Sequence, residues 1–186
     1  MISMRKLVLI VTALLVLAAT AGAQTAAVFA KPCVITSIGQ NSDAAIVKVL
    51  LNSKLKMGID YNTVLKPAEL GDVKVIIMVL GASAKGLGAA GINMDQEIAR
   101  TEALLKQARQ SGIKVIAMHT GGANRRGQAS NNLIDIVLRS ADAVIVVAAG
   151  NTDKYFDKAE KKPGISIIET QTIAEAGLAV QKLFSN

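Results

Sequence analysis

Short apolar runs alternate with segments of helical periodicity from Cys33 to the end of the chain, as in parallel β-α-β units. Two runs, Val73–Leu80 and Ala143–Ala149, are apolar throughout, which is typical of strands covered on both faces. The segments predicted to be strands are CVITSI, MGIDYN, VKVIIMVL, IKVIAMH, AVIVVAA and GISIIE. We expect an α/β fold with a single three-layer, doubly wound, mostly parallel sheet of five or six strands. It is flavodoxin-like or Rossmann-like, with strand order 2-1-3-4-5.

The second of these strands is the weakest, because the segment around it is polar and contains Pro67. It is expected to be an edge strand or mostly loop. The predicted helix starts, each marked by a side chain that can cap the first turn, are Ser42, Asn93 with Gln96, Ser130, and Thr172 with Glu175. The helix after Ser42 carries Ile46, Val49 and Leu50 as its apolar residues.

Residues 1–30 have the three parts of a secretory signal peptide. Arg5 and Lys6 form a basic start, Leu7–Ala19 is apolar except for Thr12, and small residues follow. Because the apolar run is shorter than the roughly 20 residues of a membrane-spanning helix, we favour a cleaved leader over a membrane anchor. We therefore expect export to the periplasm or the extracellular space, or membrane anchoring if the leader is not cleaved.

Two cleavage points fit the small residues after the apolar run, one after Ala23 in AGA and one after Ala30 in VFA. The second is preferred because Lys31 and Pro32 begin a segment of different composition. The chain is thus divided into a signal peptide, residues 1–30, and a single α/β domain, residues 31–186. That remainder has the usual size of one domain.

The net charge of +7 favours an anionic partner without specifying it. Nucleic acid is not expected, because many of the basic residues are scattered lysines and no aromatic platform accompanies them. Cys33 is the only cysteine, which excludes an intramolecular disulfide, and it is predicted to be a buried thiol. One cysteine and one histidine cannot form a zinc ligand set, so no metal site is expected.

Ligands of doubly wound sheets bind beyond the carboxyl ends of the strands, near the point where the strand order reverses. The loops expected there are GQNSD (residues 39–43) and GASAKGLGAAG (residues 81–91). HTGGANRRGQAS (residues 119–130) and GNTD (residues 150–153) follow at the next two strand ends. The predicted ligand-binding residues are Asn41, Ser42, Ser83, Lys85, Gly86, Gly88, Gly91, His119, Gly121, Gly122, Arg125, Arg126, Asn151 and Asp153.

Gly86, Gly88 and Gly91 have the G-x-G-x-x-G spacing of a dinucleotide-binding loop. NAD is disfavoured because the motif does not follow the first strand directly, and no carboxylate ends the next strand. FMN is disfavoured because few aromatic residues could stack on a flavin, so no cofactor is predicted. The glycines are interpreted as a nest of backbone N–H groups beside Lys85, suited to carboxylate or phosphate, or else as close packing plus a turn.

His119, Asp153 and Glu97 are the candidate catalytic residues, with His119 as general base and a carboxylate as its partner in a hydrolase or transferase. No G-x-S-x-G nucleophile elbow accompanies them, so we lean against an enzyme. An accessible His119 ring near a carboxylate would favour catalysis, whereas a buried ring bonded to a carbonyl would disfavour it. Glu97 and Arg100, one helical turn apart, most simply pair with each other.

Four motifs in order, TSIGQNSDA, GASAKGLGAAG, HTGGANRRG and VVAAGNTD, resemble those of an uncharacterised family of exported bacterial proteins with a domain of unknown function. The resemblance covers most of the predicted domain. It implies export and an α/β fold, and it implies no activity.

These observations predict an exported α/β protein that binds a small anionic molecule, such as a carboxylate or phosphate ester, at the carboxyl edge of the sheet. A membrane transporter or sensor could be the partner to which it delivers or reports that ligand. The alternatives are a hydrolase or transferase that uses His119, and an interaction module without a small-molecule site.

Overall fold

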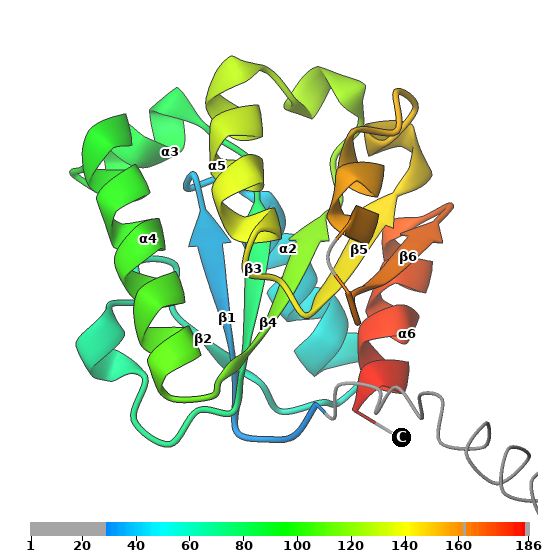
Figure 1. The fold of residues 1–186 in the computed structure, drawn as a ribbon, viewed down its shortest axis with the longest axis horizontal. Helices are drawn as coiled ribbons and strands as arrows, with labels where there is room; N and C mark the ends of the chain where they lie inside the picture. Colours follow the sequence, from blue (N-terminus) through cyan, green and yellow to red (C-terminus); the bar gives the residue numbers. More distant parts are fainter. Residues whose placement is uncertain (1–28, 162, 185–186) are drawn as a thin grey trace, which may run out of the picture.

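A six-stranded sheet with helices on both faces forms the fold (Figure 1). The computed structural model describes residues 29–161 and 163–184, so residues 1–28 of the predicted signal peptide lie outside the described residues. The strand order is β2-β1-β3-β4-β5-β6, and every pairing between these strands is parallel. The strands are β1 (Cys33–Ile38), β2 (Asp60–Tyr61), β3 (Val75–Leu80), β4 (Lys114–His119), β5 (Ala143–Val147) and β6 (Ser166–Thr170). The predicted α/β fold and its strand order are confirmed.

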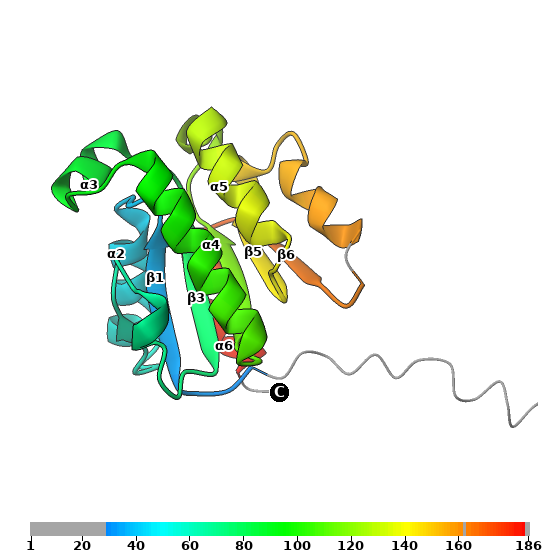
Figure 2. The ribbon, with the colours of Figure 1, turned by 60° about the vertical axis from the view of Figure 1, so that its left-hand side comes forward.

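Helices form a layer on each side of this sheet (Figures 1 and 2). One layer contains α2 (Asp43–Lys48), its π-helical continuation (Val49–Lys54) and α6 (Ile173–Leu183). The other contains α3 (Ala84–Ala89), α4 (Met94–Gln110) and α5 (Gln128–Leu138). Short 3-10 turns occupy other connections, at Pro67–Glu69, Ala123–Arg125, Ala148–Gly150 and Tyr155–Lys161.

The central strand β3 is buried at every position because it lies between β1 and β4 and is covered on both faces. Ile76 and Met78 belong to the core that includes Leu104 of α4. Ile77, pointing to the opposite face, belongs to the core that includes Val47 of α2. This two-sided burial explains the uninterrupted apolar sequence of the strand.

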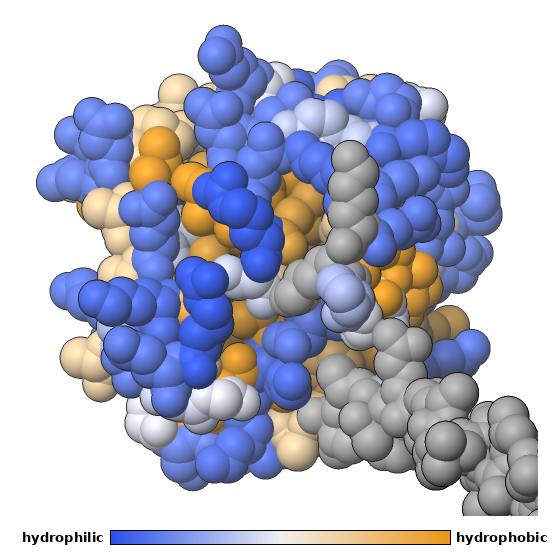
Figure 3. Space-filling model, in the orientation of Figure 1, coloured by the Kyte–Doolittle hydropathy of each residue, from blue (hydrophilic) through white to orange (hydrophobic). Residues whose placement is uncertain are grey.

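The outer surface on the side of α4 and α5 is largely hydrophilic, with hydrophobic side chains visible between the helices (Figure 3). Several of the large hydrophobic residues that are exposed lie in the opposite layer, on α2, its continuation and α6: Ile46, Val49 and Leu178. Across the two described ranges, no helix combines the length and the apolar character needed to cross a membrane.

Cys33 is 3% exposed in β1, which confirms the predicted buried thiol. Burial raises the pKa of this thiol to about 12. The thiol is therefore protonated at neutral pH, and Cys33 acts as a small apolar residue of the core.

The start and the buried face of α2 differ from the prediction. Ser42 makes no side-chain capping bond, and the first turn is held instead by Asn41, whose Oδ1 accepts a hydrogen bond from Asp43 N at 2.8 Å. Ile46 and Val49 are 50% and 49% exposed, because the buried stripe, at ordinary helical spacing, falls on other residues. The buried residues of this segment are Asp43, Ala44, Val47 and Leu51.

Helix α5 also begins earlier than predicted, at Gln128 after Gly127, so Ser130 lies inside it. The Ser130 hydroxyl accepts a hydrogen bond from Ala82 N at 2.9 Å and donates one to Arg125 O at 3.1 Å. It therefore joins neighbouring loops rather than capping a helix. The other predicted caps are confirmed by the bonds of Gln96 N to Asn93 Oδ1 and of Glu175 N to Thr172 Oγ1.

The second predicted strand is reduced to the two residues of β2 at the edge of the sheet. The segment before it is fixed by one side chain. Asn52 Nδ2 donates to Ile59 O at 2.7 Å, and Asn52 Oδ1 accepts from Ile59 N at 2.8 Å. Because Ile59 is only 4% exposed, Asn52 supplies the hydrogen bonds that water cannot.

Replacing Asn52 by Ala is expected to lower the free energy of unfolding by about 2–3 kcal/mol, because both backbone groups of buried Ile59 lose their partner. The control is Ser53→Ala at the exposed neighbouring position, which should change stability by less than about 0.5 kcal/mol. Equilibrium unfolding in urea measures both. Equal stability of the two variants would contradict the role given to Asn52.

Candidate functional site

The loops that follow β1, β3, β4 and β5 lie together at one edge of the sheet, the upper edge in Figure 1. Gln40 and Ala82 form an antiparallel bridge between the first two loops. Ala82 N donates to Ser130 Oγ on the β4 side, and Arg126 bonds to Asp153 in the loop after β5. These contacts join the four predicted loops into one surface.

A buried ion pair between Glu97 and Arg100 ties α4 to the end of β1. Glu97 is 0% exposed, and its Oε1 and Oε2 accept from Arg100 Nη2 at 2.7 Å and Nε at 2.8 Å. Glu97 Oε1 also accepts from Gly39 N at 2.6 Å. The guanidinium donates to Ser37 O at 2.6 Å and to Leu65 O at 3.0 Å. The Glu97 carboxylate thus holds the loop after β1, and the pairing with Arg100 is as predicted.

Asn41 and Ser42, in the loop after β1, differ in whether their side chains make hydrogen bonds to the rest of the protein. Asn41 Nδ2 donates to Gly81 O at 2.7 Å, so the Asn41 amide joins the loops after β1 and β3. Ser42 is exposed and makes no capping bond. Of these two predicted ligand-binding residues, Asn41 therefore has its amide engaged within the protein.

The glycine-rich segment forms helix α3, so the expected nest of free N–H groups does not form. Ser83 caps this helix, accepting a hydrogen bond from Gly86 N at 3.1 Å. A Cβ atom at Gly86 would overlap the carbonyl oxygen of Gln40, and Gly91 has a φ of +68°, whereas Gly88 has open space around it. The alternative interpretation, close packing plus a turn, fits Gly86 and Gly91.

Lys85 lies on α3 with an exposed side chain. It makes no hydrogen bond or ion pair within residues 29–161 and 163–184. The hollow described below does not include it among its lining residues. Lys85 is therefore not among the residues that line that hollow with Arg125 and Arg126.

His119 is fully buried at the end of β4. Its Nδ1 lies 2.9 Å from Leu80 O, which assigns the ring proton to Nδ1, and its ring stacks on Phe156 with centroids 5.3 Å apart. Burial lowers the pKa of His119, so the ring is neutral at pH 7. A buried ring bonded to a carbonyl is the arrangement that disfavours general-base catalysis.

Arg126 is held in place by Asp153 and an aromatic ring. Its side chain is 10% exposed, its Nη1 donates to Asp153 Oδ1 at 2.8 Å, and its Nη2 bonds the other carboxylate oxygen. The guanidinium carbon lies 4.3 Å from the centroid of the Tyr155 ring. Hydrogen bonding from Arg126 keeps the pKa of Asp153 below its ordinary range. Asp153 is thus the counter-ion of Arg126, and Arg126 Nε is buried without a partner among the described residues.

Asn151, another predicted ligand-binding residue, is 1% exposed and fully engaged. Its Nδ2 donates to Asp157 Oδ1 at 2.9 Å and to Glu169 Oε2 at 2.8 Å. Its Oδ1 accepts a hydrogen bond from Phe156 N at 2.9 Å. Asn151 therefore shapes the loop after β5 and has no group left for a ligand.

A hollow of about 370 Å³ lies at the start of α5, lined by Ala82 and residues 124–130. We call it the Arg125 hollow. Arg125 is exposed, and within the described ranges its guanidinium has no hydrogen bond or ion-pair partner. Gly121 makes room for it, since a Cβ there would lie 2.6 Å from Arg125 Cβ, whereas the nearest atom to a Cβ at Gly122 lies at 3.4 Å. Among the described residues, Arg125 is therefore the unpaired cation that lines this hollow.

Several residues that line the Arg125 hollow escaped the sequence prediction: Asn124, Gln128, Ala129 and Ser130. The prediction placed the start of this helix at Ser130, whereas the helix begins at Gln128. The backbone N–H groups of the first turn were therefore not recognised as donors. Gly127 could have indicated the earlier helix start, since glycine is common at the position that precedes a helix.

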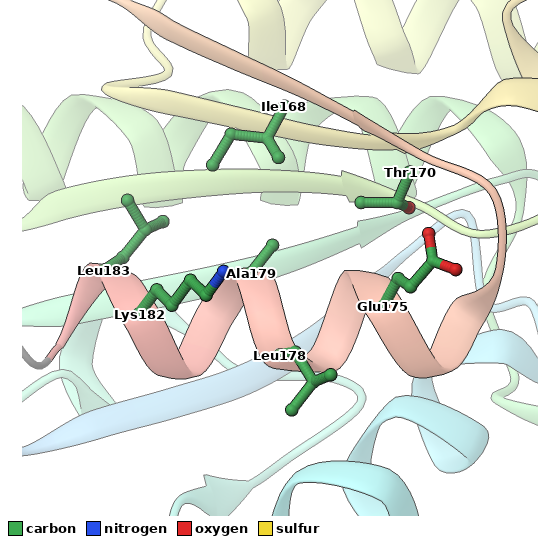
Figure 4. A pocket seen from close by; sticks show the side chains of 7 residues that line it. All are labelled: Ile168, Thr170, Glu175, Leu178, Ala179, Lys182 and Leu183. Atoms are coloured by element: carbon green, nitrogen blue, oxygen red, sulfur yellow. The ribbon is translucent and has the colours of Figure 1, made fainter.

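Other hollows lie away from these loops. One of about 410 Å³ lies between β6 and α6, where Ile168, Ala179 and Leu183 line it together with Glu175 and Lys182 (Figure 4). Another of about 410 Å³ lies at the amino end of the sheet, between the start of β4 and the ends of α4 and α5. In the described part of the chain, no three His, Cys, Asp or Glu side chains cluster as metal ligands would.

Comparison with known proteins points to a family without an assigned activity. The model of the family described as Domain of unknown function (DUF6305) matches residues 30–184. No curated protein and no solved structure matches the chain. The matched range spans all four loops of the carboxyl edge.

Replacing Gly86 by Ala is expected to destabilise the fold by about 2–3 kcal/mol, because the new methyl group overlaps the Gln40 carbonyl. Gly88→Ala in the same helix is the matched control, since no atom lies within 4 Å of the added carbon. It should stabilise the protein by up to about 1 kcal/mol. Thermal unfolding compares the two, and similar effects would show that close packing is not the role of Gly86.

Stability is expected to fall as the pH decreases from 7 to 5. The folded-state pKa of His119 lies below the ordinary value of 6.5, so the unfolded chain binds the proton first. The loss is at most about 1.4 kcal/mol per pH unit for one proton. His119→Asn keeps a donor for Leu80 O but cannot titrate, so its stability should vary less over this range. Parallel pH profiles of the two proteins, measured by urea unfolding, would contradict the assignment.

Proposed function

The chain belongs to the DUF6305 family of domains of unknown function, and from its carboxyl edge we propose that it is an exported protein that binds a small anionic molecule. The site is the Arg125 hollow, and the ligand is a carboxylate or a phosphate ester. The observation that carries the proposal is an unpaired arginine beside an uncapped helix start in the same hollow.

The charge of the hollow supports this proposal. Arg125 and Arg126 both line it, and none of its lining residues is acidic. Arg126 already has Asp153 as its counter-ion, so the charge of Arg125 remains to be neutralised. A carboxylate or phosphate could accept two parallel hydrogen bonds from that guanidinium.

The start of α5 supplies donors beside this charge. Gly127 precedes the helix and offers no side-chain cap. Within the described residues, the backbone N–H groups of Gln128 and Ala129 have no hydrogen-bond partner, as expected for the first turn of a helix. These groups and the positive end of the helix dipole favour an anion at the same place as Arg125.

Arg126 lines the hollow with a side chain that is already held in one position. Its side chain is nine-tenths buried, bonded to Asp153 and stacked on Tyr155, so binding a ligand would not require it to be ordered first. The Nε group is buried without a partner among the described residues and adds one unsatisfied donor beside the hollow. A volume of about 370 Å³ is in the range of small-molecule sites.

Export and delivery complete the proposal. The basic and apolar start of the chain supports export, and a membrane transporter or sensor is the partner that would use a captured anion. The buried, carbonyl-bonded His119 gives no support to a hydrolase.

Inorganic phosphate and small carboxylates are the probes for calorimetric titration of the protein. Arg125→Ala is expected to weaken binding about 10- to 100-fold, because a charge-assisted hydrogen bond of about 1.5–3 kcal/mol is lost. Arg125→Lys keeps the charge but not the paired donors, and should fall between the wild type and Arg125→Ala.

The matched control is Arg109→Ala, which removes the same charge at the hollow at the amino end of the sheet. Lys85→Ala, on exposed α3, is a second control. If Arg109→Ala or Lys85→Ala weakened binding as much as Arg125→Ala, general charge rather than this site would explain the affinity. If no anion bound, the proposal would be wrong.

A further inference from the structure

Phe29 is part of the hydrophobic core although it lies inside the predicted signal peptide. It is 5% exposed and belongs to the same core as Cys33 of β1 and Met57 before β2. Its ring contacts that of Phe184, the residue after α6, with centroids 6.3 Å apart and an interplanar angle of 51°. Phe29 therefore bridges the beginning and the end of the folded domain.

The chain after Phe29 is also fixed. Lys31 Nζ donates to Met57 O. Pro32 O accepts from Lys74 N at 2.8 Å and from Val75 N at 3.3 Å, which attaches the start of β1 to the start of β3. Ala30, between the buried ring and these bonds, is exposed. The ordered domain thus includes residues on both sides of the Ala30–Lys31 bond.

Cleavage after Ala30 would remove Phe29 from the mature protein. The core would lose a buried aromatic side chain, and Phe184 would lose the ring that it contacts. Cleavage after Ala23 has no such consequence, because the new chain would begin at Gln24 and keep Phe29. The AGA sequence also has a small residue at both positions that the A-x-A pattern requires, whereas VFA has valine at the first.

We propose that a signal peptidase hydrolyses the Ala23–Gln24 bond, so that the mature protein begins at Gln24 and Phe29 completes its core. The reaction consumes one water molecule and leaves a carboxylate on Ala23 and an amino group on Gln24. The inference rests on the export proposed above and is independent of the anion site.

The first test is the N-terminus of the exported protein. The full chain is produced with its own leader in a secreting bacterial host, and the mature protein is analysed by intact mass and by its N-terminal peptide. The expected chain begins at Gln24. Ala23→Leu should block cleavage and accumulate precursor, whereas the control Ala30→Leu, at an exposed position, should be processed normally.

The outcomes separate the two proposals. A mature chain that begins at Lys31 would overturn the Ala23 site and leave export intact. Absence of cleavage in the wild type would overturn the cleavage site, and whether the uncleaved domain lies inside or outside the cell would then decide the proposed export separately. Neither result would alter the predicted anion binding, which is measured on the folded domain.

The second test asks whether Phe29 is present in the mature fold. In the exported protein, Phe29→Ala should lower the melting temperature by about 8 °C or more, because a buried aromatic side chain is lost. Phe29→Leu should lower it less. If Phe29 were removed with the leader, the mature Phe29→Ala and wild-type proteins would be identical, and their equal melting temperatures would overturn the proposal.

Discussion

The buried ion pair of Glu97 and Arg100 is the interaction on which the carboxyl edge depends. Its carboxylate is fully excluded from water and accepts from Gly39 N, and its guanidinium donates to the carbonyls of Ser37 and Leu65. Removing one partner of such a pair leaves an uncompensated buried charge, at a cost of about 3–5 kcal/mol. The pair therefore fixes the end of β1 against α4. The loop after β1 is held in place by this contact, and the neighbouring loops bond to it in turn.

Further hydrogen bonds from polar side chains connect the other loops of this edge. Asn41 bonds Gly81 and the start of α2, Ser130 joins Ala82 to Arg125, and Asn151 organises the loop after β5. Each of these side chains has its hydrogen bonds directed inward. These polar residues thus hold loops together, whereas Arg125 in its hollow, like Lys85 on α3, has no partner within the described residues.

The sheet could be predicted from the sequence because strands that are buried on both faces consist of uninterrupted apolar residues. The positions of β1, β3, β4 and β5 follow from such runs. The buried face of α2 was predicted wrongly, since the buried Ala44, Val47 and Leu51 repeat at the same helical spacing as the predicted apolar residues, and Ile46 is exposed. For Gly86, close packing was one of two interpretations that the sequence left open, and its partner could not be named because Gln40 lies far away in the sequence.

The candidate site was predictable as a region but not residue by residue. The four strand-end loops meet because the strands are parallel, which their sequences indicate. Arg126 is paired and Arg125 is not, because Asp153 of another loop bonds to Arg126. A contact between two loops leaves no pattern in the local sequence.

The central claim is that the start of α5, together with Arg125, binds an anion. The most direct measurement is a titration of the isotopically labelled protein with inorganic phosphate, followed by the NMR signals of its backbone amides. The account predicts saturable shifts that are largest at Gln128 and Ala129, whose N–H groups are free at the first turn of α5. Shifts that do not saturate, or that centre on the glycine-rich helix α3, would contradict it.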